Sequence, residues 1–197
     1  MSRTLVRRHP GVSFSASQRG FTLTELVIVL GIATTLSTLG VSGFQSLVAS
    51  NQVDTLATTL RTSLMWARSE AINRGQRVLL CRQALILGEC AGSGATGKIS
   101  WNQGWLVFVD QDNDRQLDAT QGDLLLQVFE PLGLRQRLMW NRGDFIAYDA
   151  SGALGSLNGT FCVGHANGDT GLQRKLVLPH SGRLRTAATP CHYTLVL

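Results

Sequence analysis

A single carboxylate interrupts an apolar stretch near the start of the chain. Residues 21–50 contain no proline and one charged side chain, Glu25. About 20 apolar residues in a helix cross the hydrocarbon core of a bilayer, so this stretch is long enough to span a membrane once. A carboxylate inside the membrane boundary is costly without a partner. A cut after Gly20 would free the amine of Phe21 one helical turn from Glu25, where the amine of a neighbouring subunit could meet the carboxylate.

The charges of the chain are unevenly distributed. Residues 1–20 contain four arginines and no acid, so they carry +4 of the formal net charge of +5. A basic flank orients an apolar span with that end toward the cytoplasm. An ordinary secretory signal fits less well, because Gly20 precedes the apolar stretch instead of following it as a cleavage site; a plain membrane anchor is a further alternative. Since 21–197 are nearly neutral, the total charge does not by itself indicate nucleic-acid binding.

The string RGFTLTELVIVLGI (19–32) resembles the prepilin leader of type IV pilins and type II secretion pseudopilins. The resemblance implies that prepilin peptidase cuts between Gly20 and Phe21 and that Phe21 is then N-methylated. It also implies that Glu25 recruits or registers the subunit in a helical filament. One departure is Ser42, because major pilins usually have a proline near this position.

The next segment changes from helical to strand periodicity. Apolar residues recur at steps of three and four from Val53 to Ala71, which predicts a helix to about Asn73 with Gly75 as its C-terminal cap. Short apolar runs separated by turn residues then predict strands. These runs are 77–82, 105–110, 124–129, 145–149, 160–164, 175–179 and 192–197.

These patterns predict an α+β chain with a long N-terminal helix packed on an antiparallel β-sheet head, which is the type IV pilin fold that the resemblance implies. We expect a leader peptide at 1–20, a helix at 21–74 whose part 21–49 is the transmembrane segment and filament core, and a β-rich periplasmic head at 75–197. The chain is then a single-pass inner-membrane protein before assembly and part of a pilus or pseudopilus afterwards.

The head contains four cysteines, which allow three pairings. A location outside the cytoplasm permits disulfides. We favour Cys81–Cys90, because it closes a short loop, and Cys162–Cys191, because it ties the last strand to the sheet. A zinc site is the alternative, and no CxxC or HxxxH spacing supports it.

Two further segments, 101–118 and 145–154, resemble the head of the FimT/GspH-type minor pilins and pseudopilins. The resemblance implies a minor subunit present in few copies, at or near the filament tip or in the initiating complex. Its implied partners are other pilin or pseudopilin subunits, prepilin peptidase and the inner membrane.

Two arginines near the C-terminus have a spacing that suits phosphate recognition. In an extended segment Arg183 and Arg185 would point to the same side, and their planar donor groups match phosphate oxygens. Arg174 and Lys175 are near in sequence, and 131–197 carry a net +4 against −5 for 83–130. The string GRLR also resembles the C-terminal GRxR element of DNA-binding FimT minor pilins. That resemblance implies a contact between Gly182, Arg183, Arg185 and double-stranded DNA; solvated ends of a hairpin, or a protein partner, are the alternatives.

Other motifs predict no catalytic or cofactor site. GSGATGK (92–98) is followed by Ile99, whereas a phosphate-binding loop has Ser or Thr at this position. The sequence contains no motif typical of a catalytic triad or of paired catalytic carboxylates. DQDNDRQLD (110–118) places three aspartates at calcium-loop positions, but Arg115 replaces the turn glycine and Gln121 the twelfth-position glutamate. An acidic hairpin loop is the preferred interpretation, with a calcium site as the alternative. We predict a non-enzymatic protein with no cofactor and no metal.

Three functions fit these observations. The first is a FimT-like minor type IV pilin that binds extracellular DNA for uptake in natural transformation. The second is a GspH-type minor pseudopilin of a type II protein secretion system. The third is a minor pilin that primes pilus assembly without binding DNA.

Overall fold

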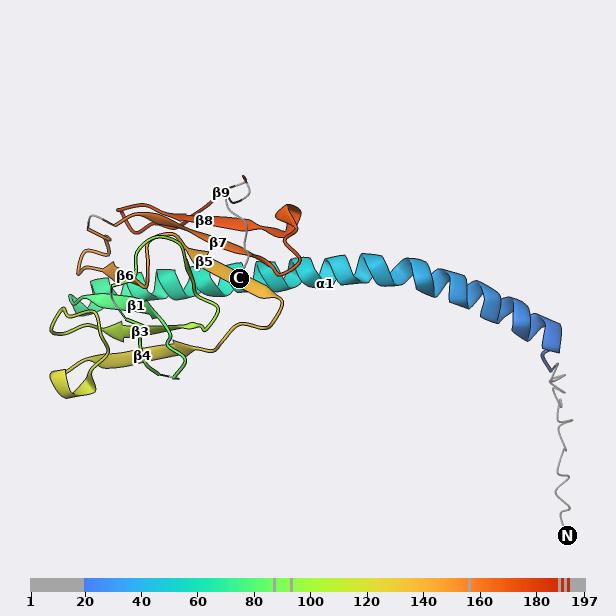
Figure 1. The fold of residues 1–197 in the computed structure, drawn as a ribbon, viewed down its shortest axis with the longest axis horizontal. Coiled ribbons are helices and arrows are strands. Elements are labelled where there is room, and N and C mark those ends of the chain that lie inside the picture. Colours follow the sequence, from blue (N-terminus) through green and yellow to red (C-terminus); the bar gives the residue numbers. More distant parts are fainter. Residues whose placement is uncertain are drawn as a thin grey trace, which may run out of the picture. The chain divides into compact units, whose positions relative to one another are not determined.

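A computed structural model of the chain describes residues 20–86, 88–92, 94–155, 157–187, 189 and 191, without the side chains of 38–42 (Figure 1). The chain divides into two compact units, Met1–Phe44 and Gln45–Leu197. The leader before Gly20 and the strand predicted at 192–197 lie outside the described residues.

The long helix α1 spans Leu23–Arg74, and both of its ends carry capping interactions. At the start, the Glu25 amide donates to Thr22 Oγ1 over 3.3 Å, which is the backbone half of a capping box. At the end, Gly75 has a φ of +63°, and the amide of Gln76 donates to the Ala71 carbonyl over 3.3 Å. These features define a Schellman cap. The predicted helix end and its glycine cap are therefore confirmed.

The described part of the first unit is a helix with apolar side chains on all sides. Side chains more than half exposed include Leu23, Leu26, Val27, Ile28, Val29, Leu30, Ile32 and Leu36. A helix that is apolar all round is normally covered by other helices or by lipid. Within the described residues, no helix combines the length and apolar character that crossing a membrane requires. The span predicted at 21–49 is thus not confirmed and stays a prediction.

The described part of the second unit contains two antiparallel sheets. The first has the order β4-β3-β1-β6 and the second the order β2-β5-β7-β8-β9. The strands of the first sheet are β1 (Val78–Arg82), β3 (Trp105–Val109), β4 (Leu124–Phe129) and β6 (Phe145–Tyr148). The strands of the second sheet are β2 (Ile99–Ser100), β5 (Gln136–Trp140), β7 (Gly159–His165), β8 (Arg174–Leu178) and β9 (Arg185–Ala187). Two short 3₁₀ helices, η1 (Ala119–Gln121) and η2 (Thr170–Leu172), lie in connecting loops.

Six of the predicted strands are confirmed within one residue at each end, and β2, β5 and β9 were not predicted. The missed strands are short or polar at one end: β5 begins Gln136-Arg137, and β9 is Arg-Thr-Ala. Their strand conformation depends on hydrogen bonds to a neighbouring strand. Such pairing is a property of the tertiary structure, and the alternation of apolar and polar residues along the sequence does not reveal it.

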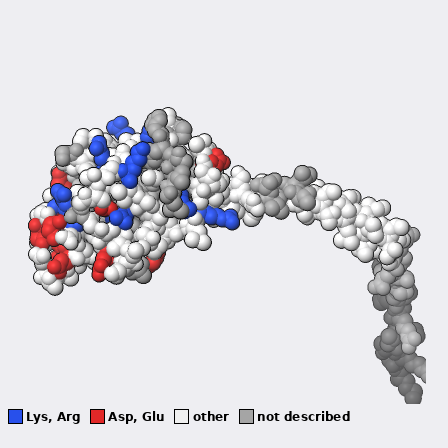
Figure 2. Space-filling view, viewed as in Figure 1, with Lys and Arg blue, Asp and Glu red and all other residues white. Residues whose placement is uncertain are grey.

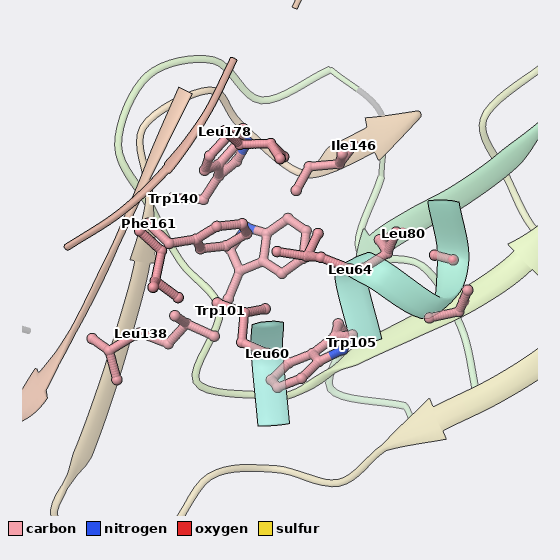
Figure 3. Packing of buried hydrophobic residues seen from close by; sticks show 14 of the residues in the cluster. Leu60, Leu64, Leu80, Trp101, Trp105, Leu138, Trp140, Ile146, Phe161 and Leu178 are labelled. Atoms are coloured by element: carbon pink, nitrogen blue, oxygen red, sulfur yellow. The ribbon is translucent and has the colours of Figure 1, made fainter. Parts of the chain in front are cut away.

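The predicted apolar stripe of α1 forms the centre of the core. Six stripe residues are buried, namely Val53, Leu56, Leu60, Leu64, Ala67 and Ala71. They join one cluster with residues of both sheets, and Figure 3 shows Leu60 and Leu64 among Trp101, Trp105 and Trp140. The Trp140 ring stacks on Phe161 with centroids 4.4 Å apart. Because Trp140 is fully buried in the core, its ring cannot stack on the bases of a nucleic acid.

Both favoured disulfides are confirmed. Cys81 bonds Cys90, and Cys162 bonds Cys191. The first closes the loop after β1, and the second ties the segment after β9 to β7, two strands away in the sheet. With all four cysteines paired, no thiolate is left to act as a zinc ligand.

Truncation of the core side chain of Leu64 tests the packing of α1 on the sheets. Leu64 is fully buried, so we expect Leu64→Ala to lower the free energy of unfolding by about 2–5 kcal/mol. Met65→Ala is the control, since Met65 is 56% exposed one residue along the same helix. Urea unfolding followed by circular dichroism measures both, and an equal loss in the two variants would contradict the packing.

Candidate nucleic-acid interface

The GRLR segment follows a tight turn between β8 and β9. The Gly182 amide donates to the Pro179 carbonyl over 2.9 Å, and Gly182 adopts a left-handed φ of +70°. A side chain at this position would collide with the Gly152 carbonyl and the Tyr148 ring. The glycine is therefore required for the backbone to pack closely here, which positions the arginine that follows it.

Arg183 and Arg185 are both exposed, whereas Leu184 between them packs on the core. In the part of the chain that the structure describes, neither guanidinium takes part in a hydrogen bond or an ion pair. Both cations are therefore accessible to solvent, as a phosphate contact would require. The alternation with a half-buried leucine that packs on the core holds the segment on the head while both charges face solvent.

Arg183 faces the second half of α1 across a groove of about 410 Å³. Its lining includes Arg61 and Arg68 from the helix, with apolar side chains of Met65, Ile72 and Leu184. The Arg68 Nε donates to the Gly152 carbonyl over 2.8 Å, which holds this arginine in place. Arg61 is exposed and also lines an adjoining hollow of about 210 Å³.

Arg61 and Arg68 were missing from the sequence-based site. Their spacing of seven residues places them on one face of a helix, two turns apart and off the apolar stripe. That pattern is visible in the sequence. Their approach to Arg183, more than a hundred residues later, follows from the tertiary fold.

Arg185 and Lys175 lie on the same face of the second sheet. Arg185 is directly opposite Val177 in the β8–β9 ladder, and Lys175 lies two residues before Val177. Opposite residues of an antiparallel pair share a face, and diagonal neighbours are about 7–8 Å apart. Lys175, which is half-buried, and Arg185 thus provide two neighbouring positive charges on this hairpin.

Arg174 does not join these cations. Its Nε and Nη2 bond the two carboxylate oxygens of Asp54 over 2.7 and 3.2 Å, and its Nη1 donates to two nearby carbonyls. This bidentate pair links β8 to α1. The structure therefore gives Arg174 a role in packing the helix against the sheet instead of an open phosphate contact.

The head is electrically polarised. Figure 2 shows acidic side chains gathered at the end of the head where β3 and β4 are joined, and basic ones on the side of β8 and β9. Burial raises the pKa of Asp110 at the acidic end, an effect that the nearby Arg77 guanidinium partly offsets. The separation leaves a positive surface beside the GRLR segment that the acids do not neutralise.

The remaining sequence motifs lie elsewhere. The glycine-rich segment ending at Gly97 leads into the two-residue strand β2, so no helix N-terminus is present to bind a phosphate there. Phe21 is 84% exposed at the start of the described chain, and Glu25 is exposed in the first turn of α1.

A long N-terminal helix, whose second half packs on the antiparallel sheets of a disulfide-bonded head, defines a pilin-type subunit. The family model described as "Type II transport protein GspH" matches residues 56–182. The chain therefore belongs to the GspH family, as its resemblance to FimT/GspH-type heads predicts. A second model, "Prokaryotic N-terminal methylation motif", matches residues 15–41.

Solved structures of one minor pilin share the fold. The type IV minor pilin FimU of Pseudomonas aeruginosa PAO1 is 17% identical, with a TM-score of 0.54 over 73% of this chain and 92% of that one. The minor pseudopilin EpsH of the Vibrio cholerae type 2 secretion system is 16% identical, with a TM-score of 0.48 over 70% of this chain and 97% of EpsH. No curated protein matches the sequence. Membership of the GspH family makes the chain a structural subunit that assembles with other subunits, and not an enzyme.

A methyl group added at Gly182 tests how this glycine positions the arginines. We expect Gly182→Ala to destabilise the head by at least about 1 kcal/mol more than Gly168→Ala. Both glycines have left-handed φ values, +70° and +75°, but only Gly182 lacks space for a side chain. Thermal unfolding of both variants measures the difference, and equal melting temperatures would show that the close contact is unimportant.

Proposed function

We propose that this chain is a FimT-like minor pilin that contacts extracellular double-stranded DNA through its C-terminal segment. The observation that carries the proposal is the pair of exposed guanidiniums of Arg183 and Arg185, which have no ion-pair or hydrogen-bond partner among the described residues, on either side of a core-packed leucine. Arg61, across the groove from Arg183, and Lys175, beside Arg185, extend the positive surface.

Phosphate oxygens are the chemistry that this surface fits. Arginine forks bind phosphate through paired hydrogen bonds, and surface contacts of this kind read no base sequence. With three or four cations per subunit, binding by one subunit would be weak and strongly salt-dependent. Capture at the tip of a filament and retraction toward the cell would then bring DNA to the surface for natural transformation.

Assembly would depend on the N-terminal segment. In this proposal prepilin peptidase removes residues 1–20, Phe21 is methylated, and Glu25 meets the free amine of a neighbouring subunit. The exposed apolar side chains of the described part of 21–49 support burial in the inner membrane before assembly, with the head in the periplasm, and in the filament core afterwards.

A minor pseudopilin of a type II secretion system is the second candidate. The match to the GspH family model favours it directly. The shared fold does not distinguish it from a minor pilin, with or without DNA binding. Absence of DNA binding by the purified chain, together with a secretion defect in a deletion strain, would select this function.

The DNA contact is tested by Arg183→Gln combined with Arg185→Gln. Electrophoretic shifts with linear double-stranded DNA are measured for the full chain in a non-ionic detergent across a salt series. We expect the variant to bind at least tenfold more weakly at low salt and its log–log salt slope to be reduced by about 2, because two phosphate contacts are lost.

A charge-matched control is Arg74→Gln with Arg135→Gln, two exposed arginines outside the groove. This control is expected to retain nearly all binding. Equal retardation by the native chain and the Arg183/Arg185 variant would remove the DNA assignment, whereas equal losses in both variants would show that only total charge matters.

Processing and assembly are tested by Glu25→Ala in cells that contain the filament machinery. Mass spectrometry is expected to show both native and variant chains beginning at Phe21, with an N-methyl group on the native one. Sheared filaments should contain the native chain and lack the variant, since the variant has no carboxylate for a neighbouring amine. Cleavage at any other bond, or normal incorporation of the variant, would contradict the proposal.

A further inference from the structure

The loop between β3 and β4 brings four carboxylates together. Asp110 follows β3 directly, Asp112 and Asp114 lie in the loop, and Asp123 comes immediately before β4. One oxygen from each carboxylate lies within 4.8 Å of those of the other three. Asp123 joins the others because β3 and β4 are antiparallel neighbours, so the end of one lies beside the start of the next.

Asp110 is the member of this cluster that indicates a ligand. Its side chain is completely buried and has Arg77 as its ion-pair partner, and neither of its oxygens meets the geometry of a hydrogen bond from a described residue. The Arg77 Nη1 is 3.1 Å from Asp110 Oδ2, but its hydrogen bonds go to the carbonyl and Oδ1 of Asn113, over 3.3 and 3.1 Å. Burial of a carboxylate is costly unless a charge pairs with it or a metal binds it, and Arg77 supplies only one such charge beside four clustered carboxylates, so lone pairs remain for a bound cation.

The other three carboxylates are held in position by backbone amides. Asp112 Oδ1 accepts from the Asp114 amide over 3.1 Å, and Asp114 Oδ1 from the Gln116 amide over 2.6 Å. Asp123 accepts from the amides of Gln111 and Asp118 over 2.8 and 3.0 Å. A carboxylate oxygen has a second lone pair, so each remains able to bind a cation. The loop is thus ordered around the cluster by contacts that leave ligand capacity.

We propose that Asp110, Asp112, Asp114 and Asp123 bind a calcium ion. Calcium takes oxygen ligands at about 2.3–2.6 Å, so two ligands of one ion are up to about 5 Å apart, and the spacing of these oxygens fits that limit. Magnesium ligands at about 2.0–2.1 Å would be at most about 4.2 Å apart and would require the cluster to contract. The hard oxygen donors exclude a preference for soft metals.

The sequence departs from the calcium-loop pattern at Arg115 and at Gln121, and the structure shows how each departure is compensated. Asp123 supplies the acid that Gln121 does not, from two residues further along the chain. Arg115 stands where calcium loops have a glycine, and it adopts the left-handed φ of +70° that this glycine would take. Its guanidinium lies over the Phe145 ring at 4.6 Å from the centroid instead of entering the cluster.

The proposal is tested with the full chain in a non-ionic detergent, freed of metal by EDTA and then dialysed. Isothermal titration with CaCl₂ should show one saturable site with a dissociation constant on the order of 10⁻⁴ M. Thermal unfolding should show a rise in melting temperature of roughly 5 °C at about 5 mM CaCl₂. The same concentration of MgCl₂ should give a clearly smaller rise.

Asp112→Asn with Asp114→Asn removes two exposed ligands while each new amide oxygen keeps its backbone hydrogen bond. We expect this variant to lose the calcium response. In EDTA it should melt at or above the native temperature, because two mutually repelling charges are gone. Asp149→Asn with Asp169→Asn is the charge-matched control, since both aspartates are exposed and outside the cluster, and it should respond to calcium like the native chain.

No heat of binding and no shift in melting temperature for the native chain would overturn the proposal. So would an equal calcium response in the Asp112/Asp114 variant, and an equal rise with magnesium would overturn the assignment to calcium. The single variant Asp112→Asn, expected to weaken binding at least tenfold, provides the same test if the double variant does not fold. None of these results depends on DNA binding.

Discussion

Burial of the apolar stripe on the second half of α1 is the constraint on which the head depends. Each fully buried aliphatic side chain contributes about 1.5–3 kcal/mol relative to exposure. The stripe is wide enough that the two sheets together cover it, with Trp101 and Trp105 filling the space beside Leu60 and Leu64. For this reason the compact unit begins at Gln45, inside the helix, and not at the helix end where the sequence pattern changes.

This packing also determines which cations are available. Where α1 lies against β8, Arg174 pairs with Asp54 and becomes part of the scaffold. Where α1 lies beside the GRLR segment, Arg61 and Arg68 line the same groove as Arg183. The helix thus occupies the guanidinium of one predicted contact residue and adds cations that belong to a distant part of the sequence.

The acidic and basic ends of the head are well suited to different ligands. The aspartates between β3 and β4 are concentrated around a buried carboxylate, whereas the arginines beside β9 are exposed and dispersed along an edge. A small divalent ion requires converging ligands, and a polyanion requires a row of separate charges. Because the two groups lie on different sheets, neither neutralises the other, and the nearly neutral net charge of residues 21–197 conceals both.

The sequence by itself determined the helix, its glycine cap, six of the strands and the class of subunit, because these depend on local periodicity, turn residues and a contiguous motif. It also indicated both disulfides, since short-range loop closure and the position of the last cysteine favour them. The tertiary structure decided the polar or short strands β2, β5 and β9, which need a partner's hydrogen bonds. It alone brought Asp123 to Asp110 and placed Arg61 and Arg183 along one groove, since these positions come near each other only after the sheets and helix have packed.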